Sequence, residues 1–128
     1  MAKVVGLGGI FFKAADPAAL SAWYTQHLGL TFEHWGGVRF DDGESIAGYS
    51  LWAPFSADTD YFAPSQQPYM VNFQVDDLDA LLAQLRAEGV TVDERVEEST
   101  AGRFGWIMDP EGRRIELWQP PAGEPKAK

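Results

Sequence analysis

The chain has 128 residues, 45% of them hydrophobic and 13% aromatic, which fits one compact domain with a sizeable core. Its 19 acidic and 10 basic side chains give a net charge of -9, which disfavours nucleic acid and anionic membrane surfaces as partners. The absence of cysteine excludes disulfides, a thiolate nucleophile and a Cys-type zinc site, and no apolar run approaches the ~20 residues of a membrane span, so we expect a cytoplasmic protein.

A strand and a helix are the first elements expected in chain order. Alternating apolar side chains at Ile10 and Phe12 predict the strand. Asp16 followed by Pro17 is typical of a helix N-cap with proline at the first helical position, and apolar and aromatic side chains then recur at helical spacing. Gly29 stands where a left-handed cap would end this helix. Short strand candidates follow near 30–35, 37–40 and 46–52.

The same order of elements returns in the second half. Alternation at Phe73 and its neighbours predicts a strand, Asp76 or Asp77 predicts the helix N-cap, and Gly89 predicts the helix end. The segment Asp109-Pro110-Glu111-Gly112 is typical of a tight turn between two strands. The further strand candidates lie near 90–96, 103–108 and 114–119.

These halves are two copies of one unit. Phe12 matches Phe73 at the start of each copy, and segment 49–54 matches segment 115–120 at the end. Each copy therefore predicts a βαβββ module. We expect a single domain over 1–128, built of module 3–53 and module 68–120, with linker 54–67 and a loose tail at 121–128.

Several motifs stand out along residues 5–120: Ala15-Asp16, Trp23-Tyr24, Leu28-Gly29-Leu30, the run from Val75 to Leu81, Asp109-Pro110-Glu111-Gly112 and Ile115-Glu116-Leu117. With these motifs the chain resembles the glyoxalase/bleomycin-resistance/dioxygenase superfamily, also called the vicinal oxygen chelate (VOC) superfamily. The resemblance implies an α+β fold in which the two βαβββ modules form a curved mixed sheet with a concave binding face.

The resemblance also implies metal ligands at two positions per module, which fall here on Gly9, Ser50, Met70 and Glu116. Glu116 is the one usual ligand among them, because glycine has no side chain, a protonated serine is a poor ligand and a lone thioether is soft. The two histidines, His27 and His34, lie elsewhere in the sequence. We therefore expect no metal and no other cofactor.

Alternation along the strands predicts an aromatic cleft with a few polar groups, as is usual for a small-molecule site. A collapsed cleft or a dimer contact is the alternative interpretation. In the loop before the second module, Tyr61-Phe62 is either a lid over the cleft or a hydrophobic anchor. The expected ligand-binding residues are Phe11, Lys13, Ser50, Trp52, Met70, Asn72, Gln74 and Trp118, with Trp106 joining from a neighbouring strand.

The leading functional hypothesis is a glyoxalase-like protein that binds a small organic molecule, cationic or aromatic, without a tightly held metal. A second hypothesis is a glyoxalase-type lyase or isomerase, for which Glu116 is the expected catalytic residue, taking a proton alpha to a carbonyl. A third is a non-catalytic domain whose cleft buries a protein partner. We also expect a homodimer, because a second copy can cover exposed apolar edges of the sheet.

Overall fold

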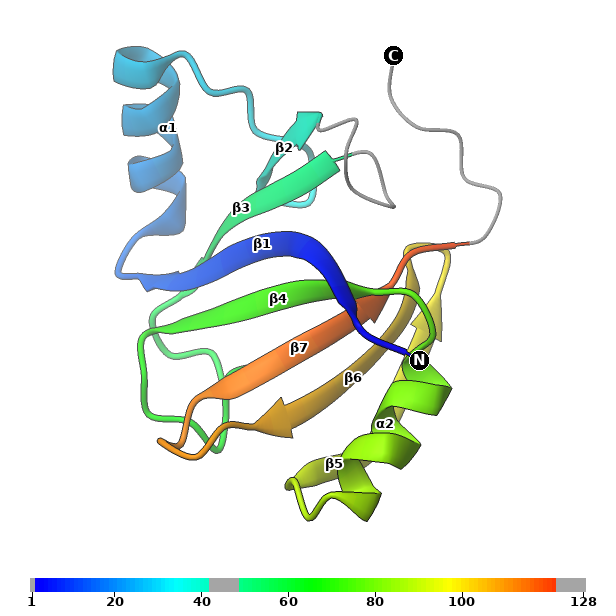
Figure 1. The fold of residues 1–128 in the computed structure, drawn as a ribbon. Coiled ribbons are helices and arrows are strands. Elements are labelled where there is room, and N and C mark those ends of the chain that lie inside the picture. The colour runs from blue at the N-terminus through cyan, green and yellow to red at the C-terminus, as the bar shows by residue number, and fades with distance from the viewer. Residues whose placement is uncertain (1, 42–48, 122–128) are drawn as a thin grey trace.

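The computed structural model describes residues 2–41 and 49–121, and these residues form one curved seven-stranded sheet with two helices (Figure 1). The elements in chain order are β1 (Val4–Ala14), α1 (Pro17–Leu28), β2 (Val38–Asp41), β3 (Tyr49–Ser56), β4 (Tyr69–Val75), α2 (Leu78–Ala87), β5 (Val92–Ser99), β6 (Gly102–Met108) and β7 (Arg114–Gln119). The α+β fold expected from the sequence is confirmed.

The two modules join edge to edge in the middle of the sheet, whose strand order is β2-β3-β1-β4-β7-β6-β5. The first strands of the modules, β1 and β4, pair antiparallel, with Phe11 opposite Met70. On each side the first strand then pairs in parallel with the last strand of its own module, β1 with β3 and β4 with β7. The last strands of the two modules, β3 and β7, therefore flank the central pair of β1 and β4.

The first module is less regular than the sequence predicts. Segment 30–35 is not a strand and contributes an isolated bridge between Phe32 and Val38. The strand expected at 46–52 begins, within the described residues, at Tyr49 and continues to Ser56, into the expected linker. Residues 46–48 and the expected tail beyond residue 121 lie outside the described residues.

Local capping chemistry fixes both helices where the sequence predicts them. The Asp16 carboxylate accepts a hydrogen bond from the Ala19 N–H at 3.0 Å, and Asp77 caps α2 in the same way through the Ala80 N–H at 3.1 Å. Gly29 has a φ of 71° just after α1, the left-handed conformation that glycine adopts without strain. No helix in the described ranges is both long and apolar enough to cross a membrane.

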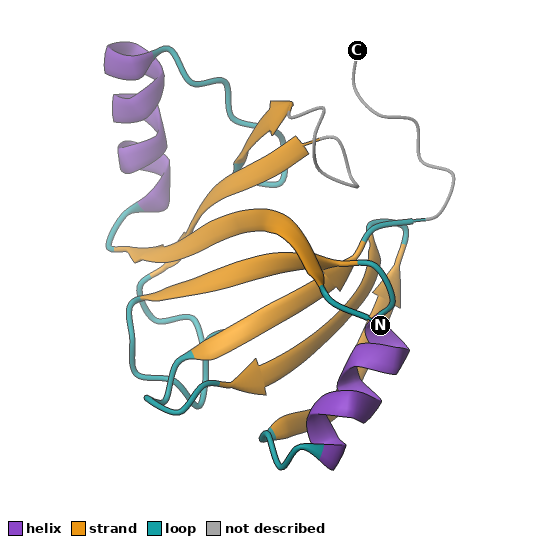
Figure 2. Cartoon of the chain, viewed as in Figure 1, coloured by secondary structure: helices purple, strands orange, loops and turns teal. Residues whose placement is uncertain are grey.

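The helices lie at opposite ends of the sheet and differ in how they pack (Figure 2). Helix α2 buries leucines against β7, in a cluster made of Val75, Leu78, Leu81, Leu82 and Leu117. A second cluster lies on the other face of the sheet and consists of Phe11, Ala53, Phe62, Met70 and Trp106. Phe62 is fully buried there, so it anchors the loop between β3 and β4, which confirms the anchor interpretation for that residue.

Candidate ligand-binding site

A cavity of about 450 Å³ is lined by side chains from the central strands β3, β1, β4 and β7. Three of the side chains expected to bind a ligand line it, namely Phe11, Asn72 and Trp118, and so does Glu116, the expected catalytic residue. The remaining lining residues were not expected from the sequence to bind a ligand: Trp35, Gly36, Arg39, Tyr49, Leu51, Ala53, Pro54, Phe55, Tyr61, Ala101 and Phe104.

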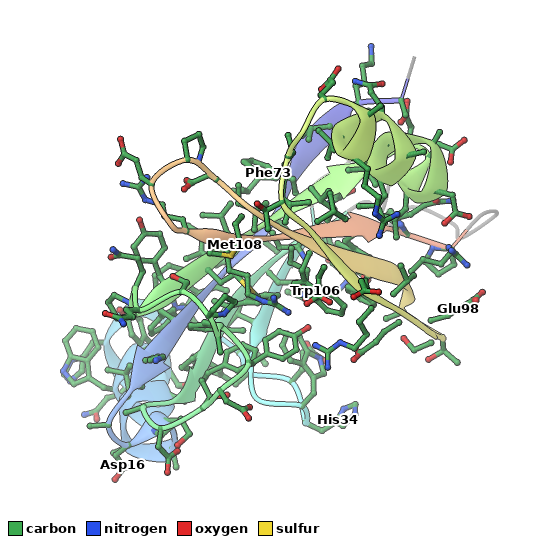
Figure 3. All side chains as sticks on the ribbon, turned by 90° about the horizontal axis from the view of Figure 1, so that it is seen from below. Asp16, His34, Phe73, Glu98, Trp106 and Met108 are labelled. Carbon is green, nitrogen blue, oxygen red and sulfur yellow. The ribbon has the colours of Figure 1, made fainter. Side chains whose placement is uncertain are left out.

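Glu116 is the acidic side chain among these lining residues, and it is 1% exposed. Its Oε1 accepts a hydrogen bond from Asn72 Nδ2 at 2.6 Å. Its Oε2 accepts hydrogen bonds from the Tyr61 hydroxyl and from Trp106 Nε1, the latter at 3.0 Å. Figure 3 shows Trp106 among the side chains at the centre of the molecule, while Glu98 and His34 lie at its periphery. The carboxyl group is therefore held in place by three donors from three elements of the fold.

Burial controls the acid–base behaviour of this carboxyl group. Loss of hydration raises the pKa of Glu116 above its ordinary value, while the hydrogen bonds from Tyr61, Asn72 and Trp106 and the charge of Arg114 oppose the rise. Burial first, and then the adjacent Glu116 carboxylate, raise the pKa of Tyr61 far above its ordinary value. Tyr61 therefore keeps its proton at neutral pH and acts as a donor to Glu116.

Stacked rings form one wall of the cavity. Phe104 and Trp118 lie parallel, with ring centroids 6.1 Å apart and an interplanar angle of 1°. Trp118 also contacts Tyr49 at a centroid distance of 5.6 Å, and the Arg39 guanidinium lies over the Tyr49 ring, 3.7 Å from its centroid. This aromatic wall therefore runs through Phe104, Trp118 and Tyr49 and ends at a cation.

A second group of rings that lines the cavity comes from β1, β3 and the loop after β3. Phe55 contacts Phe11 at a centroid distance of 5.2 Å and stacks on Tyr61 at 5.5 Å with an interplanar angle of 11°. Tyr61 thus makes two contacts at the cavity, since its ring stacks on Phe55 and its hydroxyl donates a hydrogen bond to Glu116. From the sequence, Tyr61 and Phe62 are expected to form either a lid or an anchor. The contact of Tyr61 with Glu116 joins residues 55 positions apart, and no local motif predicts it.

The orientation expected for β3 is wrong by one residue. The side chains of β3 that line the cavity are Tyr49, Leu51, Ala53 and Phe55, together with Pro54, whereas Ser50 and Trp52 do not line it. Trp52 instead packs against Phe12 and Tyr24, at centroid distances of 4.5 and 6.0 Å, on the face that carries α1. Because side chains alternate along a strand, a slip of one residue moves every side chain to the other face.

Four further expected binding residues do not line the cavity. Met70 is buried in the apolar cluster beneath it, and Trp106 reaches the site through its hydrogen bond to Glu116. Gln74 donates to the backbone carbonyl of Tyr49 at 3.0 Å, and the Lys13 ammonium lies 5.8 Å from the centroid of the Phe62 ring. The side chains of these four residues therefore contact other protein groups and do not face the cavity.

The donor set does not fit a metal of the kind that the superfamily implies. Ser50 is turned away from the cavity, Met70 is packed among apolar side chains, and Glu116 already accepts three hydrogen bonds. Both His27 and His34 are exposed and lie outside the cavity lining. Among the described residues, no three His, Cys, Asp or Glu side chains come together as a metal site would require.

Comparison with known proteins shows the family of this chain. A family model described as a glyoxalase-like domain matches residues 9–118. The chain belongs to this glyoxalase-like domain family. The same fold is found in a glyoxalase/bleomycin resistance protein/dioxygenase superfamily member from Vibrio splendidus 12B01, which is 12% identical to this chain, with a TM-score of 0.56 over 93% of this chain and 99% of that chain.

Other solved structures that are similar to this glyoxalase-like chain are those of epimerases. Methylmalonyl-CoA epimerase from Mycobacterium tuberculosis is 25% identical over 92% of this chain and 89% of that chain, with a TM-score of 0.63. A methylmalonyl-CoA epimerase in complex with methylmalonyl-CoA and NH4+ is 20% identical over 98% of this chain and 100% of that chain, with a TM-score of 0.73. A search of curated proteins gives no match.

Proposed function

We propose that this glyoxalase-like domain binds a small organic molecule with a flat aromatic body in the cavity, without a tightly held metal. The observation that carries the proposal is a cavity of about 450 Å³ lined by two groups of contacting rings, each with one stacked pair, and by one buried carboxyl group. This volume lies in the range of roughly 300–1,000 Å³ that is usual for small-molecule sites. The likeness to a protein solved in complex with methylmalonyl-CoA supports a small-molecule ligand in general terms.

The hydrogen bonds of Glu116 weaken the case for a cationic ligand. That expectation depends on a carboxylate without partners among the indoles, and three donors reach this one. A buried carboxylate with such donors does not need a ligand cation to offset the loss of its hydration. The aromatic walls are therefore the stronger guide to the ligand.

The binding test uses 2-naphthamide, a neutral flat probe, measured by isothermal titration calorimetry. We expect saturable binding, and we expect Phe104→Ala to weaken it roughly two- to tenfold, because an aromatic pair contributes about 0.5–1.5 kcal/mol beyond burial. Phe40→Ala is the matched control, since Phe40 is exposed on β2 and outside the cavity lining. Absence of binding, or an equal effect of both substitutions, refutes the proposal. Elemental analysis that finds one transition metal per chain refutes its metal-free part.

A second candidate function is proton transfer at a carbon alpha to a carbonyl, with Glu116 as the base. Its support is a buried carboxyl group with a raised pKa at the cavity, together with the likeness to epimerases. With methylmalonyl-CoA in deuterated water, the base would remove the alpha proton and the solvent would return deuterium. We expect incorporation that is lost in Glu116→Gln. A rate equal to that without protein argues against this reaction on that substrate.

A further inference from the structure

We propose that the cavity selects organic anions and that Arg39 at its mouth determines this specificity, binding the carboxylate or another acidic group of a flat ligand. The inference rests on the proposed function, because it names the class of molecule that the aromatic cavity takes. Arg39 is the cationic side chain among the described residues that line the cavity. The acidic lining residue, Glu116, is almost fully buried, whereas the Arg39 side chain is 38% exposed, so the two charges occupy the deep part and the mouth.

The packing of Arg39 leaves much of its hydrogen-bonding capacity available. Its guanidinium lies with its carbon 3.7 Å from the centroid of the Tyr49 ring, an arrangement that uses a face of the group and leaves its N–H edges accessible. Within the described residues its Nε donates to Asp41 at 3.3 Å, and no other hydrogen bond of Arg39 is formed there. The two terminal nitrogens can therefore form the paired contact to a carboxylate that a guanidinium fork favours.

The aromatic wall places a ligand body next to this group. Phe104, Trp118 and Tyr49 contact one another in sequence, and Arg39 covers the last ring. A flat molecule lying along the wall would bring one end to Arg39 and keep the other near Glu116. An anionic group is favoured at the Arg39 end and disfavoured at the Glu116 end, so the arrangement also fixes the orientation of the ligand.

The net charge of -9 opposes anionic ligands at long range, and distance decides between the two effects. At physiological ionic strength the Debye length is about 8 Å, so charges spread over the exposed surface are largely screened. A direct contact with Arg39 takes place at hydrogen-bond distance and is screened much less. Among the described residues, the carboxylate nearest to Arg39, that of Asp41 at 3.3 Å, is paired with Nε and leaves the two terminal nitrogens for a ligand. We therefore expect the contact with Arg39 to outweigh the distant charges near 0.15 M salt, and low salt to reduce the preference.

The test compares three probes of similar shape, 2-naphthoate, 2-naphthamide and 2-naphthylmethylamine, by calorimetry near 0.15 M salt. We expect the anion to bind about tenfold more tightly than the amide, a ratio that corresponds to one charge-assisted contact, and the amine to bind most weakly. Arg39→Gln should lower the affinity for naphthoate to about that for the amide, while Arg39→Lys should retain part of the preference because it keeps the charge without the fork. Arg86→Gln is the control, since Arg86 is exposed on α2, donates to the backbone carbonyl of Asp93 and lies outside the cavity lining.

The possible outcomes separate the two proposals. If the amide binds and naphthoate binds no more tightly, or if the preference persists in Arg39→Gln, the anion inference is wrong and the proposed function stands. If no probe binds, the proposed function and this inference both fail. Tighter binding of the amine than of naphthoate would restore the cationic ligand expected from the sequence and overturn the role of Arg39.

Discussion

At the residue scale, the most unusual feature of this molecule is a carboxyl group buried in the interior, where an ionisable group is costly to place. Glu116 is 1% exposed, and its three hydrogen bonds recover part of the hydration that it loses. Loss of hydration nevertheless dominates, so the protonated form is favoured in the folded state relative to the unfolded state. A group of this kind changes the stability of the fold as it titrates.

The sign of this effect gives a prediction. Because the pKa of Glu116 is raised in the folded state, its stabilising contribution is fully present below about pH 4.5 and is lost as pH rises through the folded pKa. Glu116→Gln cannot titrate, so the free energy of unfolding of wild type relative to this variant should fall as the pH rises above about 4.5 and through the raised pKa of Glu116. Urea unfolding at several pH values measures it, with the exposed Glu94→Gln as control. A difference that stays constant with pH would contradict a raised pKa.

At the element scale, glycine in β1 makes room for the site. The pairing of β1 with β4 shifts register between Leu7 and Gly9, and Gly8 lies at this irregularity. A Cβ on Gly8 would lie 1.8 Å from Asn72 Oδ1 and 3.0 Å from Trp118 Cε3. The absence of a side chain at Gly8 thus allows Asn72 to reach Glu116 and Trp118 to complete the aromatic wall.

Gly8→Ala should therefore damage both the fold and the site. We expect the free energy of unfolding to fall by roughly 1–3 kcal/mol, as is usual when a well-packed interior is overfilled. We also expect weaker binding of 2-naphthamide, because Asn72 and Trp118 must move. The matched control is Gly105→Ala, another strand glycine, whose Cβ would meet the flexible end of Leu82 at 3.1 Å. Thermal unfolding and calorimetry measure the two effects. Equal losses in both variants would show that Gly8 has no special role.

The elements also differ in how far the sequence could predict them. Asp16 and Asp77 cap their helices through contacts within one helical turn, and such local contacts can be predicted from the sequence. The face of β3 is not local. The matching Leu-Trp pairs at the ends of the two modules suggested that Trp52 corresponds to Trp118, but Trp52 packs towards α1 while Trp118 lines the cavity. Strand register depends on partners far along the chain, so a short repeat can mislead by one residue.

The same distinction holds for the candidate site. Glu116 was identified because it occupies a ligand position of the superfamily, and Asn72 because it alternates correctly along β4. Arg39 lies in a short strand without a motif, so the sequence does not point to it, and its proposed role depends on a contact with Tyr49 of the neighbouring strand. The deep polar group was predictable from sequence, whereas the mouth of the cavity follows from tertiary structure.

At the scale of the whole molecule, the two modules are unequally covered. The β5 edge carries Glu94, Glu97 and Glu98, and such charges protect a strand edge from pairing with another chain, so apolar edges are not the general feature expected from the sequence. The first module is different. None of the α1 side chains described is buried, and Trp23 and Phe40 are 50% and 45% exposed. A partner copy would gain most by covering the first module.

We therefore predict a homodimer that buries α1. The hollow beside this helix is lined by Leu20, Trp23 and Tyr24, side chains that one module leaves partly open to water and a second copy can cover. Light scattering on a sizing column at micromolar concentration should give twice the chain mass of 14.2 kDa, and Trp23→Glu should give the monomer, because it places a charge in the contact. Val96→Glu, a similar change at an exposed position of the charged β5 edge, should leave the dimer intact. Because each copy carries a net charge of -9, dilution at low salt should favour the monomer. A wild-type protein that is monomeric near 0.15 M salt would exclude the dimer. A dimer that survives Trp23→Glu but is lost in Val96→Glu would place the contact away from α1.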